Sequence, residues 1–535
     1  MLITGGKVFD GSGNPWVAQD IGIKDGVIHV VPHGSAPSAV EVIEASGRMV
    51  CPGFIDMHSH SDLMLFAEPE SRLKVLQGVT TEVLGQDGIG PAPISRGNAK
   101  QWERFLSGLA GTVERDWDWE SLGDYLSALE RARPSVNVLS YLPQGNVRLE
   151  VLGLERKTPG PADMERMRKM IRRGMEDGAF GMSVGLIYLP CFYSSEQELI
   201  ELYSEVARAG GIMVVHMRNE GDFLIEAIEE VMRIAGSSGT PLHISHFKSV
   251  GRPNWPKYPR ALEMIEEARA RGLDVTFDQY PYIAASTFLM ALLPPWALEG
   301  GVDRTVERLR DASTRAKISH QIENGMDDPA AQRASGWDNY ARLAGWDGVL
   351  VTSVESRENA RFQGKTVTEI AVARGVDPAS AVFDLLVEER CAVGMAVFMM
   401  SEDNVALGMK SPYHTVGTDG LLAGKPHPRA GGSYPRILGR YVRDSKVLTL
   451  QEAIRRMTHA PAMRLGLKSR GLIRDGMAAD IVVFNPETVL DLNSFDSPRT
   501  PPAGIDWVLV NGVVVVRNGK HTGQRPGRVL RKGAD

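Results

Sequence analysis

The sequence predicts an α/β fold: a (β/α)8 barrel, a small β-sandwich formed by both termini, and a helical insertion. Three observations predict it. Apolar strands alternate with amphipathic helices through the middle of the 535-residue chain, a pattern typical of a parallel sheet. Short strands separated by turn residues occupy both ends. A charged helical stretch interrupts the alternation late in the barrel.

Eight apolar segments are the candidate strands of the barrel. They alternate with helices such as Met164 to Gly178 and Ser195 to Ala209, where apolar residues recur at three- and four-residue spacing. Eight such units close a barrel, whose active site lies at the carboxyl ends of the strands. The segments, in chain order, are residues 53–60, 79–87, 136–141, 180–184, 212–216, 241–246, 274–278 and 413–419.

The strand-rich ends set the predicted domain boundaries. Residues 1–50 and 466–535 are expected to pair into one β-sandwich, because chain termini often lie close together. Residues 51–465 form the predicted barrel. A helical insertion at about 289–346 leaves it where active-site loops begin, which favours a lid or a substrate-shaping subdomain; the alternative is a solvent-exposed decoration.

Composition excludes several classes of function. The formal net charge is −6, so no basic field indicates binding to nucleic acid or to an anionic membrane. Three widely spaced cysteines cannot form a disulfide framework. The first residues lack the pattern of a signal peptide, and no apolar run approaches the roughly 20 residues of a membrane span. A cytoplasmic location is therefore expected, whereas the oligomeric state stays open.

Candidate metal ligands lie at the ends of five predicted strands. His58 and His60 are two residues apart, so their side chains project from the same face of the first strand. One histidine at a strand end is weak evidence, but five strands of one barrel that end in His or Asp predict a metal site. Imidazole and carboxylate ligands suit zinc first, with cobalt, manganese or iron as alternatives, and one or two divalent ions. The predicted ligands are His58, His60, Asp87, His216, His246 and Asp419.

Hydrolysis follows from such a site. Bound zinc lowers the pKa of its water to about 7 and polarises a carbonyl. A free carboxylate nearby can take the proton of that water and deliver it to a leaving amine. Asp419 is the candidate for this role, because the turn Gly417-Thr418-Asp419-Gly420 leaves its carboxylate exposed to the site. The alternative is an ordinary turn residue or a helix cap.

These residues resemble a known family. The array is similar to the amidohydrolase superfamily, and most closely to the N-acyl-D-amino-acid deacylases (D-aminoacylases), over nearly the whole chain. The resemblance implies a barrel of amidohydrolase type and metal-dependent hydrolysis of the amide in a small-molecule N-acyl-D-amino acid. The motifs that carry it are Gly53–His60, Gly78-Val79-Thr80-Thr81, His216–Glu220, Ser245-His246-Phe247-Lys248, Tyr280-Pro281-Tyr282, Gly417–Gly420, His427-Pro428-Arg429 and Arg470–Asp480.

The resemblance also implies individual roles. His216 and His246 would hold the tightly bound metal, while His58, His60 and Asp419 would line the neighbouring site. A carboxylate substrate needs cations and hydrogen-bond donors at a fixed distance from the metal. The residues implied to bind it are Lys248, Tyr282, Ser286 and, as a further anion-binding candidate, Arg429.

One departure bears on the metal. In the turn Gly85-Gln86-Asp87-Gly88, Asp87 stands where the best-known D-aminoacylases have a cysteine ligand. A carboxylate can ligate or bridge two metals, whereas a thiolate is softer and favours zinc. The swap could therefore change the number and identity of the ions.

Two rival functions stay open. The first is a cyclic-amide (hydantoinase- or dihydroorotase-like) or ester hydrolase on the same barrel. Residues 180–189 contain no lysine that could be carboxylated as in hydantoinases, which argues against cyclic amides. The second rival is a catalytically silent metal-binding or scaffold protein, which has no need for the full ligand set.

Overall fold

The computed structural model describes residues 1–34 and 39–534. Within these ranges, eight parallel strands surround the core as predicted. Strand β8 pairs with β7 and β9, and β11, β12, β13, β14 and β18 follow one another in register. Their bounds are β7 (Phe54–Asp56), β8 (Val79–Leu84), β9 (Asn137–Ser140), β11 (Gly181–Gly185), β12 (Ile212–His216), β13 (Leu242–Ile244), β14 (Val275–Gln279) and β18 (His414–Val416).

Backbone hydrogen bonds between the two runs of strands close the barrel. The amide of Met57, just after β7, donates to the carbonyl of Val416 in β18 at 3.1 Å. On the other side, the amide of Phe180 donates to Ser140 in β9 at 3.1 Å. The predicted α/β barrel is thereby confirmed, and the carboxyl ends of all eight strands meet at one rim.

Helices cover the outside of the barrel where their apolar periodicity predicts. Helix α6 (Pro161–Glu176) buries Met164, Met167 and Ile171 against the strands. Helix α7 (Glu196–Arg208) begins at Ser195, whose hydroxyl accepts the amide of Glu198 and so caps the first turn. Among the described helices, none combines the length and apolarity that crossing a membrane requires.

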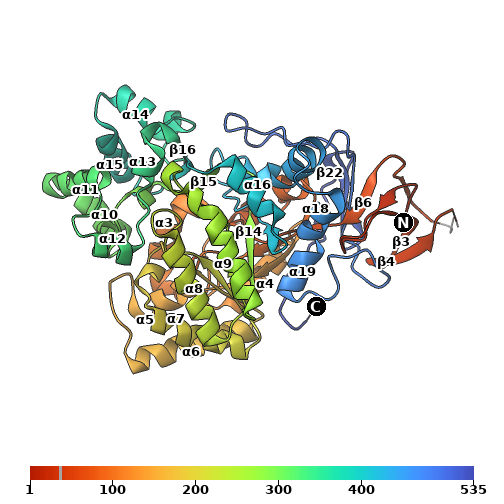
Figure 1. Ribbon diagram of the computed structural model, residues 1–535, viewed down its shortest axis with the longest axis horizontal. Helices are drawn as coiled ribbons and strands as arrows, with labels where there is room; N and C mark the ends of the chain where they lie inside the picture. Colours follow the sequence, from red (N-terminus) through yellow and green to blue (C-terminus); the bar gives the residue numbers. More distant parts are fainter. Residues whose placement is uncertain (35–38, 535) are drawn as a thin grey trace.

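The two ends of the chain form one β-sandwich, as predicted. Strand β6 (Met49–Pro52) from the N-terminal end pairs antiparallel with β19 (Ile481–Phe484) from the C-terminal end. Strands β20 (Ile505–Val510) and β21 (Val513–Arg517) form a hairpin whose turn, Asn511-Gly512, has two positive φ angles. The sandwich and the insertion lie at opposite ends of the molecule, at the right and the upper left of Figure 1.

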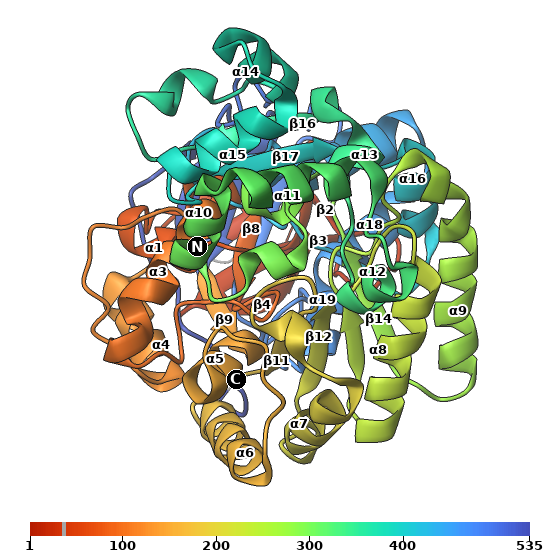
Figure 2. The same ribbon diagram turned by 90° about the vertical axis from the view of Figure 1, so that its left-hand side faces the viewer.

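The excursion between β14 and β18 contains a sheet that the sequence pattern did not reveal. Strands β15 (Ala284–Phe288), β16 (Val349–Ser353) and β17 (Gly394–Phe398) pair antiparallel. Helices pack around this sheet, both inside the predicted range of 289–346 and beyond it. They include α10 (Val302–Arg310), α11 (Ala312–Asn324), α13 (Tyr340–Ala344), α14 (Val367–Arg374) and α15 (Pro378–Glu388), and Figure 2 shows them from their own side.

The insertion is anchored on the rim of the barrel. Phe288, the last residue of β15, packs edge-on against Phe105 of α3 (Arg96–Ala110), with ring centroids 5.6 Å apart. The helical character of this segment is as predicted. The exact domain boundaries stay a prediction.

A buried lysine ties three strands together beneath the rim. The ammonium of Lys74, in α2 (Arg72–Val75), lies 2.7 Å from Asp56 Oδ2, 2.7 Å from Thr418 Oγ1 and 2.8 Å from Ser59 Oγ. Glu82 of β8 is 3.5 Å away. These partners come from the first, second and eighth strands, so one cation holds together the segments that carry His58, His60 and Asp419.

Replacing Lys74 by methionine is expected to destabilise the protein by about 3–5 kcal/mol, because the carboxylates of Asp56 and Glu82 would be left buried without a cation. Denaturant titration measures the free energy of unfolding. Arg72→Met is the matched control, since its ion pair with Glu70 is exposed and contributes less than about 1 kcal/mol. Equal stabilities of the two variants would contradict this account.

Candidate metal centre

Two histidines and an aspartate meet where the first and eighth strands end. His58 and His60 follow β7, and their Nε2 atoms lie 3.2 Å apart. Asp419 follows β18, and its Oδ1 lies 3.6 Å from His58 Nε2 and 3.3 Å from His60 Nε2. All three side chains are buried. The barrel closure between β7 and β18 is what brings these distant residues together.

Asp87 occupies the middle of the site. It follows β8 with a φ of 56°, a left-handed conformation that turns the chain sharply after the strand. Its Oδ1 lies 3.7 Å from both His58 Nε2 and His246 Nε2. Its Oδ2 lies 3.5 Å from His60 Nε2 and 3.8 Å from His216 Nδ1. Each oxygen therefore faces two imidazoles, the arrangement of a carboxylate that can bridge two ions.

His216 and His246 complete the set from β12 and the segment after β13. Their rings cross at 80° with centroids 4.4 Å apart. Both ring nitrogens of His216 are buried without a hydrogen-bond partner, a costly state for polar atoms unless a ligand satisfies them. The described residues include three groups of ligand atoms that lie within 4.8 Å of one another; they are His58/His60/Asp419, His58/Asp87/His246 and His216/Glu220/His246.

These donors fit a divalent metal. They are imidazole nitrogens and carboxylate oxygens, which suit zinc and also cobalt, manganese or iron. The structure thus brings all six predicted ligands into one cluster. Their individual roles stay predictions.

The carboxylates of the cluster are held in the ionised form. Burial alone would raise the pKa of Asp419, but the charges of Arg429 and His58 outweigh burial and hold it below its usual range. For Asp87, burial is likewise outweighed, chiefly by His58, and its pKa is lowered. Conversely, Asp87 and Asp419, together with Asp278, overcome the effect of burial on His58 and raise the pKa of its imidazole. Protons and a metal ion therefore compete for the same nitrogens.

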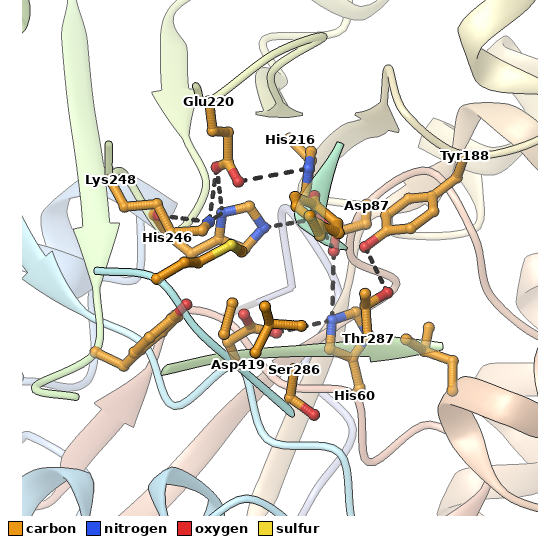
Figure 3. A pocket seen from close by; sticks show the side chains of 16 residues that line it. His60, Asp87, Tyr188, His216, Glu220, His246, Lys248, Ser286, Thr287 and Asp419 are labelled. Atoms are coloured by element: carbon orange, nitrogen blue, oxygen red, sulfur yellow. Dashed lines mark hydrogen bonds and ion pairs between the residues drawn. The ribbon is translucent and has the colours of Figure 1, made fainter. Parts of the chain in front are cut away.

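Glu220 is a member of the cluster that the sequence analysis did not single out. It lies four residues after His216, beyond the end of β12, and is buried. Its Oε1 is 3.2 Å from His246 Nδ1 and 2.6 Å from the ammonium of Lys248 (Figure 3). Burial would raise the pKa of Glu220, but Lys248, His216 and His246 together outweigh burial and lower it to about 2. The sequence signal for Glu220 was its place in the motif His216–Glu220. The rule that ligands lie at strand ends does not identify it, because Glu220 lies in the loop after β12.

Two of the residues predicted to bind substrate line the cavity above the cluster. Lys248 contacts Glu220, and its ammonium also lies 2.7 Å from His246 Nδ1 and 2.9 Å from the carbonyl of His246. Ser286 lines the same cavity, although its hydroxyl donates to the carbonyl of Met395 at 2.8 Å.

Arg429 lies behind this wall. It is fully buried, with Nη2 2.9 Å from Asp419 Oδ2 and its guanidinium 4.3 Å from the centre of the Tyr280 ring. Its Nε and Nη1 have no hydrogen-bond partner. Donors of this kind are available to an anion that enters beside Asp419.

Tyr282 is not among the side chains that line this cavity. Its hydroxyl donates to Asp491 Oδ2 at 3.1 Å, and Tyr280, not Tyr282, lines the cavity. The role of Tyr282 came from the family resemblance, and Tyr280 lies two residues before it in the same motif. The substrate-binding role of Tyr282 stays a prediction without a supporting contact.

The insertion and α3 roof the cavity. Tyr340 of α13, Val397 of β17 and Leu109 of α3 contribute apolar walls opposite the carboxylates. The free volume is about 20 Å³, room for little more than a water-sized group.

Comparisons with known proteins agree with this centre. The chain matches the amidohydrolase family over residues 41–516. It is 34% identical to an N-acyl-D-glutamate deacylase and 32% identical to a D-aminoacylase, both of Alcaligenes xylosoxydans xylosoxydans; both alignments cover 100% of this chain, and 97% and 98% of those proteins.

Solved structures extend the match to three dimensions. An N-acyl-D-glutamate deacylase from Bordetella bronchiseptica, in complex with zinc and a phosphonate inhibitor that mimics the tetrahedral intermediate, superposes with a TM-score of 0.83 at 32% identity over 99% of both chains. A D-aminoacylase with a binuclear metal centre also gives 0.83, at 31% identity over 99% of both chains. An L-hydantoinase shares the fold, with a TM-score of 0.56 at 16% identity.

The cofactor prediction is confirmed by these metal-containing relatives together with the buried imidazoles and carboxylates described above. The chain belongs to the amidohydrolase family, as a metal-dependent hydrolase of the D-aminoacylase type that acts on linear amides.

Proposed function

We propose that the protein hydrolyses the amide of N-acyl-D-amino acids to a carboxylate and a free D-amino acid. The observation that carries the proposal is the place of Asp419, an ionised carboxylate that lines the cavity and contacts both His60 and Arg429. The two deacylases that the chain matches over its whole length support the same substrate class.

Asp419 would move the protons of the reaction. A divalent ion held by the imidazoles and Asp87 would lower the pKa of a water and polarise the substrate carbonyl. The Asp419 carboxylate lies at the edge of the same cluster, with Oδ1 toward the imidazoles and Oδ2 paired with Arg429. As general base it takes the proton of the attacking water, and as general acid it passes this proton to the leaving amine.

The cations of the site would bind the α-carboxylate of the substrate. Lys248 lines the cavity, and Arg429 has two unpartnered donors beside Asp419. Charge-assisted hydrogen bonds from these groups would fix the position of the amide relative to the metal. Ser286 lies on the same wall and adds a hydroxyl group.

The rival functions have weaker support. Dihydroorotase relatives are 24% identical over 61% of the chain, and β11 with the loop after it contains no lysine near the cluster. A silent scaffold would have no need to keep four imidazoles and three carboxylates buried around one cavity, an arrangement that costs stability unless an ion neutralises it.

Matched N-acetyl-D- and N-acetyl-L-amino acids test the proposed function. On zinc-loaded protein with measured metal content, we expect release of free amino acid from D-substrates only, because the α-carboxylate and the carbonyl are both fixed in the closed cavity and the L-enantiomer would exchange two groups on the α-carbon. Hydantoin and dihydroorotate serve as cyclic controls. Turnover of a cyclic amide without turnover of any D-substrate would refute the proposal.

The Asp419→Asn variant tests the proton-transfer role. It keeps the size of the side chain but removes the base, so kcat should fall by about 100- to 10,000-fold while the fold is retained. Stopped assays of amide hydrolysis and metal analysis measure the two effects. Asp506→Asn is the matched control, since Asp506 pairs with Arg48 in the distant sandwich. A wild-type rate in Asp419→Asn, at unchanged metal content, would exclude Asp419 as the base.

A further inference from the structure

Glu220 and Asp87 lie on opposite sides of the same two imidazoles. His246 directs Nε2 toward Asp87 Oδ1, at 3.7 Å, and Nδ1 toward Glu220 Oε1, at 3.2 Å. His216 directs Nδ1 toward Asp87 Oδ2 and Nε2 toward Glu220 Oε2, both at 3.8 Å. Figure 3 shows the two carboxylates on either side of the rings. An ion held by both rings can therefore lie either between the rings and Asp87 or between the rings and Glu220.

The position of Lys248 favours a metal ion on the Asp87 side of the rings. Its ammonium lies 2.6 Å from Glu220 Oε1 and 2.7 Å from His246 Nδ1, so a cation already stands among the atoms that face Glu220. A divalent ion placed there would meet a positive charge at contact distance. On the opposite side, the ion-pair partners of Asp87 are the imidazoles of His58, His60, His216 and His246. The ion consequently belongs on the Asp87 side, and Glu220 faces the nitrogens that the ion leaves free.

We propose that Glu220 is a positioning residue that orients both His216 and His246 for the metal. A neutral imidazole that ligates a metal through one nitrogen carries a proton on the other, and a carboxylate that accepts this N–H fixes the ring and makes it a better ligand. Glu220 has one oxygen for each ring. In this structure His246 Nδ1 accepts from the Lys248 ammonium at 2.7 Å, so an ion on Nε2, which places the proton on Nδ1, turns this nitrogen from Lys248 to Glu220 Oε1. The 3.8 Å separation of Glu220 from His216 closes to hydrogen-bond distance when an ion holds Nδ1 and the proton rests on Nε2.

The backbone around Glu220 is held from two directions. Its amide donates to Asp338 Oδ2 at 2.8 Å, and its carbonyl accepts the amide of Val250 at 2.9 Å. Asp338 belongs to the insertion, just before α13. Through Asp338, the insertion holds the loop that carries Glu220, and Glu220 in turn orients the two imidazoles. The insertion thus helps to build the metal centre as well as to cover it.

The inference rests on the proposed metal centre but not on the identity of the substrate, and zinc binding tests it without any substrate. In Glu220→Gln the amide oxygen can accept from one ring only, and its NH2 group opposes the N–H of the other. We expect zinc affinity to fall by about 10- to 100-fold, measured by competition with a chromogenic chelator. The visible spectrum of the cobalt-substituted protein should change as well, because the ligand rings are free to rotate.

Two further variants make the test specific. Glu230→Gln is the matched control: Glu230 pairs with Arg218 in the neighbouring helix α8 (Leu224–Ser238) and contacts neither imidazole, so zinc affinity and the cobalt spectrum should stay as in the wild type. Glu220→Asp keeps the charge but shortens the reach, and an intermediate affinity is expected.

The metal-free proteins separate positioning from a general loss of structure. Apo Glu220→Gln is expected to melt below the wild-type apoprotein, because Lys248 loses the carboxylate that pairs with it in the buried site. Zinc affinities are therefore compared at a temperature at which both apoproteins are fully folded. Wild-type zinc affinity with an unchanged cobalt spectrum in Glu220→Gln would overturn the proposal. So would a loss of zinc binding that only follows the unfolded fraction of the apoprotein at the temperature of the titration.

Discussion

The concentration of buried charge at the rim of the barrel is the constraint on which the rest of the structure depends. Asp87, Glu220 and Asp419 share a nearly closed space with four imidazoles, and only Lys248 and Arg429 stand among them as permanent cations. Ionised groups are expensive to bury unless they are paired. Without metal, protonation of the imidazoles relieves part of this cost; a divalent ion between Asp87 and the rings relieves it more directly. The buried charges that destabilise the apoprotein are therefore the same groups that bind the metal.

Two parts of the fold hold these charged side chains in place, one beneath the rim of the barrel and one above it. Beneath the rim, Lys74 joins the segments that carry the first histidine pair and Asp419, so these ligands keep their spacing. Above it, the insertion closes the cavity with apolar walls and reaches the loop of Glu220 through Asp338. A water-poor cavity strengthens every electrostatic interaction inside it, which serves both metal binding and polarisation of an amide.

Most of the metal-ligand residues could be predicted from the sequence, because active-site residues of such barrels lie at the carboxyl ends of the strands. His216 ends β12, and His58 and Asp419 follow β7 and β18 within a few residues, so their convergence followed from the strand pattern. Glu220 was missed because a loop conformation, not strand periodicity, brings it back to the cluster. Tyr282 was named from the family resemblance alone, and the sequence contains no spacing rule that would have placed Tyr280 on the cavity wall. The sheet β15–β16–β17 escaped notice because its strands lie tens of residues apart and helices separate them.

The central claim is that Asp87 and the four imidazoles hold the metal while Glu220 and Lys248 stay outside its coordination sphere. Anomalous X-ray diffraction from zinc-loaded crystals, measured on both sides of the zinc edge, locates the ions directly. The account predicts anomalous density between Asp87 and the imidazole nitrogens that face it, with Lys248 still against Glu220. Density bonded to a Glu220 oxygen, with Lys248 displaced and Asp87 without a metal contact, would contradict it.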